Sequence, residues 1–186
     1  MRRTHGFAPE AVIFISVARL APVKNPQGVL QTFASILPYC PQARLVFVGE
    51  GPERELLEKE IESRSLTGKV ILAGEQTNIN DWLNMADVFV LLSKEESLPL
   101  ALLEAKQVGL ACIVSNVGDM PQQIKHGKNG FVCKPQDIML ASCLFTELYE
   151  NPPLRAQMGE ISLQETGTNL DSCTQYEQIY QQVQTH

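Results

Sequence analysis

The cations best suited to bind a ligand lie in one short segment near the start of the chain. Arg19 and Lys24 follow the apolar run 12–17 and precede a helical segment that begins at Pro26. Two cations beside a helix N-terminus can hold a phosphate or a diphosphate, because free backbone amides and the helix dipole add to their charge. Two ordinary surface cations are the simpler interpretation of this segment taken alone.

Two carboxylates follow a later apolar run, 88–92. Glu104 stands between Leu103 and Ala105, so its carboxylate must reach solvent or a partner. Glu96 precedes it by eight positions, a rise of about 12 Å if every step is helical. That span suits contacts with opposite ends of a sugar–diphosphate–ribose unit. A capping acid at Glu96 with a solvated Glu104 is the alternative.

Glycines and polar residues fill two further loops. The segment 49–52 (GEGP) follows the apolar run 45–48, and its glycines allow either a plain turn or the close approach of a ligand to the backbone. It is not the G-x-G-x-x-G fingerprint of dinucleotide-binding loops. The segment 74–78 (GEQTN) follows the run 70–73 and offers backbone groups that could face a base.

Six short apolar runs, rich in Val and Ile, alternate with segments of helical length. Continuous runs of this kind are typical of strands buried on both faces of a parallel sheet. The predicted strands are 12–17, 45–48, 70–73, 88–92, 112–114 and 131–133. The predicted helices are 26–37, 53–64, 80–85, 99–108, 137–149, 154–159 and 171–183. This alternation predicts an α/β fold, a doubly wound parallel sheet of about six strands with helices on both faces. Ligands of such sheets bind at the carboxyl ends of the strands.

Composition excludes several classes of function. The chain has 186 residues, 44% of them hydrophobic, and a net charge of −6. An acidic chain without a Lys/Arg block is a poor match for nucleic acid or an anionic membrane. Cys112 and Cys133 stand in apolar runs and are expected to be buried thiols of a cytoplasmic protein. Three histidines far apart along the chain predict no metal site.

Taken in order, these segments resemble the C-terminal, donor-binding domain of retaining GT-B glycosyltransferases, the group 1 or family 4 class. The resemblance covers nearly the whole chain, and the order and spacing of its motifs make it specific. The matching segments are 17–24 (VARLAPVK), 45–51 (LVFVGEG), 86–93 (ADVFVLLS), Glu96 and Glu104 with seven residues between them, 117–121 (VGDMP) and 127–131 (GKNGF). The resemblance implies one Rossmann-like domain, the C-terminal half of a GT-B fold.

The resemblance also implies roles for individual residues. Arg19 and Lys24 would hold the donor diphosphate and stabilise charge on the leaving group, with Glu96 beside the donor sugar as the third catalytic residue. Glu104 would accept hydrogen bonds from the ribose hydroxyls. The implied donor-binding residues are Arg19, Lys24, Gly49, Gly74, Gln76, Thr77, Glu96, Ser97, Leu98, Leu100 and Glu104. The donor is a nucleotide-diphosphate sugar, UDP-type by preference, and the family needs no cofactor or metal.

The chain departs from the family pattern at a few positions. Ala18 replaces the usual Gly before Arg19, and Asn25 replaces a frequent Gly after Lys24. Ser97 and Pro99 stand where many members have Gly, and Gln122 stands where a Glu is common.

The resemblance predicts how the chain is divided. Residues 1–9 are expected to end an interdomain linker, residues 10–170 to form the donor-binding domain, and residues 171–186 to form a helix that crosses back to an N-terminal domain. The chain would be half of an enzyme that moves a hexosyl group to an unknown acceptor with retention of configuration, in cell-envelope polysaccharide or glycolipid synthesis.

The expected partners are the nucleotide-sugar and the N-terminal acceptor-binding domain, with no nucleic acid. By itself the chain is expected to bind nucleotide without transferring sugar. Membrane contact would come only through the N-terminal domain, and the full enzyme would be cytoplasmic or peripheral on the inner face of the membrane. A stand-alone nucleotide-sugar-binding module is the alternative. An epimerase or a phosphorylase of the same architecture is a third interpretation.

Overall fold

Six parallel strands form one sheet in the computed structural model, which describes residues 2–97 and 99–167. The strands are β1 (Val12–Val17), β2 (Ala43–Val48), β3 (Val70–Leu72), β4 (Val88–Leu91), β5 (Ala111–Ser115) and β6 (Gly130–Cys133). Their order across the sheet is β3-β2-β1-β4-β5-β6. The predicted doubly wound, Rossmann-like α/β sheet is confirmed, and each predicted strand is present.

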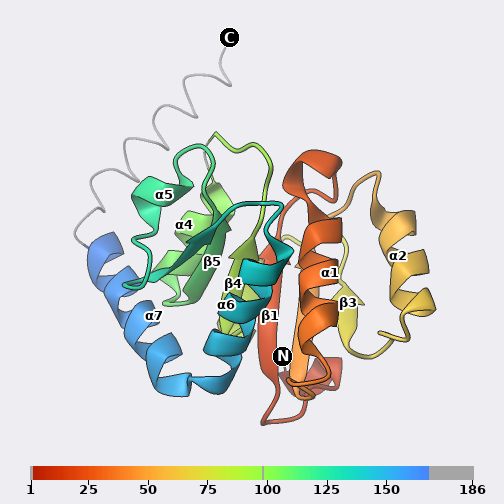
Figure 1. The fold of residues 1–186 in the computed structure, drawn as a ribbon. Helices are drawn as coiled ribbons and strands as arrows, with labels where there is room; N and C mark the ends of the chain where they lie inside the picture. The colour runs from red at the N-terminus through yellow and green to blue at the C-terminus, as the bar shows by residue number, and fades with distance from the viewer. Residues whose placement is uncertain (1, 98, 168–186) are drawn as a thin grey trace.

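Helices cover both faces of this sheet (Figure 1). Those packed on one face are α1 (Pro26–Ile36), α2 (Arg54–Ser63) and α6 (Ile138–Glu150). Those on the other face are α3 (Ile79–Met85), α4 (Leu100–Gln107) and α5 (Met120–Gln123). The last described helix, α7 (Pro152–Gly167), packs against α4, β5 and α6.

The continuous apolar runs are explained by these two layers. In β1, Phe14 belongs to the core under α1 and α6, whereas Ile13 and Ile15 belong to the core under α3 and α4. The Phe14 ring stacks on Phe145 of α6, with ring centroids 4.7 Å apart. Because successive side chains of a strand point to opposite faces, a strand buried on both faces needs apolar residues at every position.

The order of the strands reverses between β1 and β4. The chain starts in the middle of the sheet, adds β2 and β3 on one side, and then returns to place β4 beside β1. β1 continues into α1 on one face and β4 into α4 on the other face. The connections therefore diverge at the carboxyl ends of these two strands, which is where open α/β sheets bind their ligands.

The segment expected to end a linker lies at the opposite, amino end of the strands. It forms a short 3-10 helix, η1 (Arg2–His5). Its Arg2 guanidinium donates to Asp87 Oδ2 over 2.8 Å, and the same oxygen accepts from the backbone amide of Ile13 over 2.8 Å. The His5 ring lies 4.6 Å from the Trp82 ring. These contacts attach the segment to α3 and to the residue before β4, and its assignment as a linker stays a prediction.

The last described helix is longer than predicted. The sequence places a helix over 154–159 that ends at Gly159, but α7 continues through this glycine to Gly167. A Cβ at Gly159 would lie 2.0 Å from the carbonyl oxygen of Gly109. Gly159 therefore permits close contact with the turn after α4 and does not end the helix. The expected helix 171–183, and the whole segment 171–186, lie outside the described residues.

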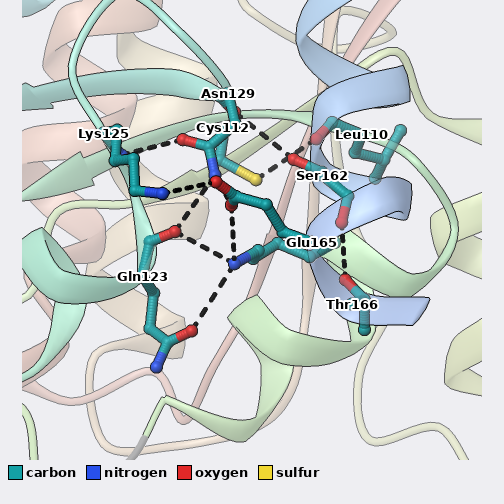
Figure 2. Close-up of polar contacts among 9 residues, drawn as sticks. Leu110, Cys112, Gln123, Lys125, Asn129, Ser162, Glu165 and Thr166 are labelled. Atoms are coloured by element: carbon teal, nitrogen blue, oxygen red, sulfur yellow. Dashed lines mark hydrogen bonds and ion pairs between the residues drawn. The ribbon is translucent and has the colours of Figure 1, made fainter. Parts of the chain in front are cut away.

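A polar cluster attaches α7 to the turn before β6 and to α4 (Figure 2). Lys106 of α4 is only 5% exposed, and its ammonium donates to the Gln123 carbonyl over 3.0 Å. Glu165 of α7 lies at the centre: its Oε2 accepts from Asn129 over 2.7 Å and lies 3.6 Å from Lys106 Nζ. Its Oε1 accepts from Lys125 Nζ over 2.8 Å.

Removal of the central carboxylate should destabilise the chain in a pH-dependent way. Burial by itself would raise the pKa of Glu165, but the Lys125 hydrogen bond and the charges of Lys106 and Lys125 outweigh it and lower that pKa. At pH 7, Glu165→Gln is expected to reduce the free energy of unfolding by about 1–3 kcal/mol, measured by urea denaturation. Because the folded-state pKa is lowered, this contribution is complete above 4.5, the ordinary value, and fades as the pH falls through the folded-state pKa.

The matched control is Glu147→Gln, which makes the same change at an exposed position of α6. It should leave the unfolding free energy nearly unchanged at every pH. Equal stability of Glu165→Gln and the parent chain at pH 7 would contradict the role given to Glu165.

Candidate functional site

The loops that follow β1 and β4 meet above the carboxyl ends of these strands. Lys24 Nζ donates to Glu96 Oε2 over 2.6 Å, joining side chains that are 72 positions apart in the sequence. The Glu96 side chain is 8% exposed and that of Lys24 is 26% exposed. Ser93 Oγ donates to the same Glu96 oxygen over 3.3 Å. Two residues singled out in separate sequence segments thus form one partly buried ion pair.

A hollow of about 350 Å³ opens beside this ion pair. Its lining residues are Val23, Lys24, Glu95, Glu96 and Ser97. The volume lies within the range of about 300–1,000 Å³ found for small-molecule sites. An ammonium group here can bind an anionic oxygen, and the carboxylates can accept hydrogen bonds from hydroxyl groups. The arrangement fits a ligand that carries both phosphate and hydroxyl groups.

The glycines after β2 allow two backbone loops to touch. A Cβ at Gly49, where φ is +135°, would lie 2.2 Å from the Ala18 carbonyl oxygen. A Cβ at Gly51 would lie 2.3 Å from the Leu20 carbonyl oxygen. The Leu20 amide donates to the Glu50 carbonyl over 2.9 Å. The space beside these glycines is therefore occupied by the chain's own β1 loop, which holds the backbone around Arg19 in place, and the role of Gly49 toward a donor stays a prediction.

The loop after β3 is held in place by one glutamine. Gln76 Nε2 donates to the Ala73 carbonyl over 2.8 Å, and Trp82 Nε1 donates to Gln76 Oε1 over 3.3 Å. The amide of Gly49 donates to the Gly74 carbonyl over 2.8 Å. Because both ends of the Gln76 amide are engaged within the chain, this side chain shapes the loop, and its predicted contact with the base stays untested.

Glu104 lies within α4, the helix that follows the loop of Glu96. α4 begins at Leu100, so Glu96 stands in the preceding loop and the eight steps between the two carboxylates are not all helical. The geometry based on a continuous helix is therefore wrong. Glu104 is half-buried, and burial raises the pKa of its carboxyl. Among the described residues, no side chain caps the start of α4.

The remaining predicted residues lie around the hollow or beyond it. Arg19 is exposed at the end of β1, and within residues 2–97 and 99–167 its guanidinium forms no ion pair or side-chain hydrogen bond. Thr77 is exposed in the loop after β3, and Leu100 is 46% exposed at the start of α4. Ser97 lines the hollow, and Leu98 lies outside the described residues.

Sequence reasoning missed the contacts made by Asn25. This residue stands at the N-cap position of α1, as predicted, but its side chain does not cap the helix. Its Nδ2 donates instead to the carbonyls of Leu92 and Pro135, each over 3.1 Å. The backbone is left-handed, with φ 56° and ψ 44°, a conformation that Asn tolerates better than most residues. The family that this chain resembles frequently has Gly at the position of Asn25, and that Gly was the available signal for a left-handed backbone here.

The loop after β5 supports the loop that carries Glu96. Ser115 Oγ donates to the Ser93 carbonyl over 2.6 Å. Gly118 has a φ of +53°, and a Cβ there would lie 1.9 Å from the Glu96 carbonyl oxygen. The backbone of Glu96 therefore rests against a position that only glycine fills without displacement.

This site lies in a chain whose residues 1–164 match the family model described as glycosyl transferases group 1. The chain belongs to the glycosyl transferases group 1 family. It is 32% identical over 186 residues to N-acetyl-alpha-D-glucosaminyl L-malate synthase of Bacillus anthracis, with 98% of this chain and 49% of that protein covered. It is 34% identical over 136 residues to an alpha-1,3-galactosyltransferase of Escherichia coli, with 72% of this chain and 35% of that protein covered. The chain thus spans half or less of these two curated relatives.

Solved structures of group 1 and related proteins share the fold. A crystal structure of Anabaena HepE in complex with UDP and glucose matches all of this chain and 51% of its own, with a TM-score of 0.86 and 20% identity. The C-terminal domain of a group 1 protein from Francisella tularensis matches over 90% of this chain and 92% of its own, with a TM-score of 0.79 and 21% identity. The fold of this chain thus matches nearly the whole of that crystallised domain.

The described residues contain neither a metal-binding group of side chains nor a membrane-spanning helix. Within residues 2–97 and 99–167, no three or more His, Cys, Asp or Glu side chains are grouped closely enough to hold a metal ion. In the same part of the chain, every helix is too short or too polar to cross a membrane.

The Gly118 contact can be tested by a pair of alanine substitutions. Gly118 and Gly127 both have positive φ, but a Cβ at Gly127 meets nothing within 4 Å. Both substitutions impose the left-handed strain of about 1–2 kcal/mol, and only Gly118→Ala also displaces the Glu96 carbonyl. Gly118→Ala should therefore lower the melting temperature more than Gly127→Ala and should increase amide hydrogen exchange in residues 93–97. Equal effects of the two variants would show that the contact does not constrain the loop.

Proposed function

We propose that this chain is the donor-binding half of a glycosyltransferase that moves a hexosyl group from a nucleotide-diphosphate sugar, of the UDP type, to an acceptor. The observation that carries the proposal is the Lys24–Glu96 ion pair, 2.6 Å long, beside a hollow where the strand order reverses. Its support is membership of the group 1 family and the UDP and glucose bound to HepE, a structural neighbour.

The charges at this edge of the sheet suit the proposed reaction. Transfer breaks the bond between the anomeric carbon and a diphosphate oxygen and forms a bond from that carbon to the oxygen of an acceptor hydroxyl group, which releases its proton. The bonding electrons stay with the diphosphate, which gains negative charge as it leaves. Arg19 and Lys24 follow β1, and fixed cations near the leaving group stabilise that charge. The family resemblance assigns this role to side chains, with no metal ion.

Lys24 can bind a phosphate oxygen without losing Glu96. An ammonium group has three protons to donate, and one of them is engaged by Glu96 Oε2. The side chain keeps 26% of its surface exposed at the hollow. In our proposal Lys24 joins the diphosphate to Glu96, and Glu96 accepts hydrogen bonds from the hydroxyl groups of the donor sugar.

The finer parts of the proposal rest on the relatives. The chain spans 49% of the Bacillus anthracis relative, which supports an N-terminal acceptor-binding domain as its partner. The Escherichia coli relative is named as acting on a GlcNAc-diphosphoundecaprenol acceptor, which supports a role in cell-envelope polysaccharide or glycolipid synthesis. We propose retention of configuration and a cytoplasmic location as well, and their support is the family resemblance.

Isothermal titration of this chain with UDP, GDP, ADP and inorganic phosphate tests the donor site. We expect saturable binding of one nucleoside diphosphate, UDP by preference, and weak binding of phosphate alone. Arg19→Ala should weaken binding by about 1–3 kcal/mol, as expected for the loss of a charge-assisted hydrogen bond. Arg64→Ala is the control, because Arg64 is paired with Glu60 at the far end of α2. No nucleotide binding by the parent, or equal binding by Arg19→Ala, would contradict the proposal.

Glu104→Gln should have two effects, one that follows from the proposed role of Glu104 and one that follows from its burial. If its carboxylate accepts from ribose hydroxyls, the variant should lose discrimination between UDP and 2′-deoxy-UDP. Burial raises the pKa of Glu104, so its ionisation begins to oppose folding as the pH rises above the ordinary value and opposes it fully above the folded-state pKa. The variant should therefore melt at a higher temperature than the parent at pH 7, and this difference should vanish below 4.5, the ordinary value. Unchanged discrimination would remove Glu104 from the ribose site.

A further inference from the structure

We propose that Asn25 is a positioning residue for the donor diphosphate: its side-chain amide joins the loops after β1, β4 and β6, so that Lys24 is held against Glu96 at the hollow. The diphosphate as ligand rests on the proposed function. The positioning itself rests on the geometry of this chain alone.

The Asn25 amide connects three loops. The residue is 9% exposed, and its Nδ2 donates to the Leu92 carbonyl at the end of β4 and to the Pro135 carbonyl after β6, each over 3.1 Å. A side-chain amide nitrogen has two protons, so both donors of this group are used. A glycine can adopt the same backbone conformation but cannot supply these two hydrogen bonds.

Lys24 lies between two connections to the loop after β4. On one side, the Lys94 amide donates to the Val23 carbonyl over 2.8 Å. On the other side, the Asn25 amide reaches the Leu92 carbonyl. Leu92 and Lys94 flank Ser93, whose hydroxyl donates to Glu96 Oε2. Both partners of the ion pair are therefore positioned by the same short stretch of backbone.

The backbone of Asn25 turns the chain immediately after Lys24. With φ 56° and ψ 44°, it ends the 3-10 helix η2 (Pro22–Lys24) and begins α1. Its amide donates to the Pro22 carbonyl over 3.2 Å, and its carbonyl accepts from the Val29 amide over 3.2 Å. Main chain and side chain together leave Asn25 little freedom to move, and Lys24 is adjacent to it.

Space for this side chain is built into the first turn of α1. A Cβ at Gly28 would lie 2.4 Å from Asn25 Nδ2 and 2.8 Å from Asn25 Cγ. Gly28 lacks that Cβ, and the Asn25 amide occupies the place. The orientation of the amide toward β4 and β6 is therefore supported by packing as well as by hydrogen bonds.

The substitution Asn25→Gly distinguishes the effect of the side-chain amide from the effect of the backbone turn. It keeps a residue that adopts positive φ readily and removes both hydrogen bonds. We expect about tenfold weaker UDP binding by isothermal titration, the order of one lost buried hydrogen bond. The matched control is Ser65→Gly, which makes the same kind of change at the other described non-glycine residue with positive φ, 57°. It should leave UDP affinity unchanged.

A double-mutant cycle with Lys24→Met shows whether Asn25 acts through Lys24. If it does, Asn25→Gly should weaken UDP binding in the parent and add almost nothing in the Lys24→Met background. Its effect on the melting temperature should be the same in both backgrounds. A purely structural role would weaken UDP binding by the same factor in both backgrounds, and that result would overturn the proposal.

A measurement without nucleotide keeps this test independent of the proposed function. Acetylation of lysine amines, followed by mass spectrometry, reports how firmly Lys24 is held, with the exposed Lys128 as the internal reference. Asn25→Gly should raise the labelling rate of Lys24 severalfold relative to Lys128. If the parent binds no UDP but this change is seen, the donor assignment fails and the positioning role stands. Unchanged Lys24 labelling would overturn the positioning role.

Discussion

Parallel pairing of β1 with β4 places every other part of the site. Phe14 lies opposite Val88 and Ile15 opposite Phe89, although these residues are more than seventy positions apart. The two strands end side by side and continue into helices on opposite faces of the sheet. Their loops therefore meet above the carboxyl ends of the strands. The Lys24–Glu96 ion pair is formed at that junction. Without this pairing the cation and the carboxylate belong to separate surface loops.

Close backbone contacts make this junction stiff. The loop after β1 touches the loop after β2 through Gly49 and Gly51, and the loop after β4 touches the loop after β5 through Gly118. Asn25 adds hydrogen bonds to the loops after β4 and β6. Each contact needs either a missing Cβ or a side chain with two donors. This requirement explains the glycines and the asparagine at this edge of the sheet. A preorganised site loses less conformational freedom when a charged ligand binds.

The cations of the polar cluster around Glu165 and those of the site differ in their exposure and in their partners. The cluster satisfies Lys106 and Glu165 almost entirely within the chain and attaches α7 to the rest of the domain. In the site, Arg19 is exposed and Lys24 faces the hollow. Lys106, buried and paired within the chain, stabilises one arrangement of helices, whereas Arg19 and the exposed part of Lys24 are available to a ligand. Burial and partners distinguish these two groups, which sequence composition cannot do.

The sequence by itself determined the α/β class, the six strands, and the identity of the charged residues in the loops, because apolar runs and helix signals are local. The family resemblance identified Lys24 and Glu96 as site residues from the sequence, but it does not contain the contact between them. Tertiary structure alone decided that these two side chains pair, that Gly159 lies within a helix, and that the Asn25 amide reaches the loop after β4. Each of these depends on a neighbour distant in the sequence or on the space beside a backbone, and a local pattern contains neither.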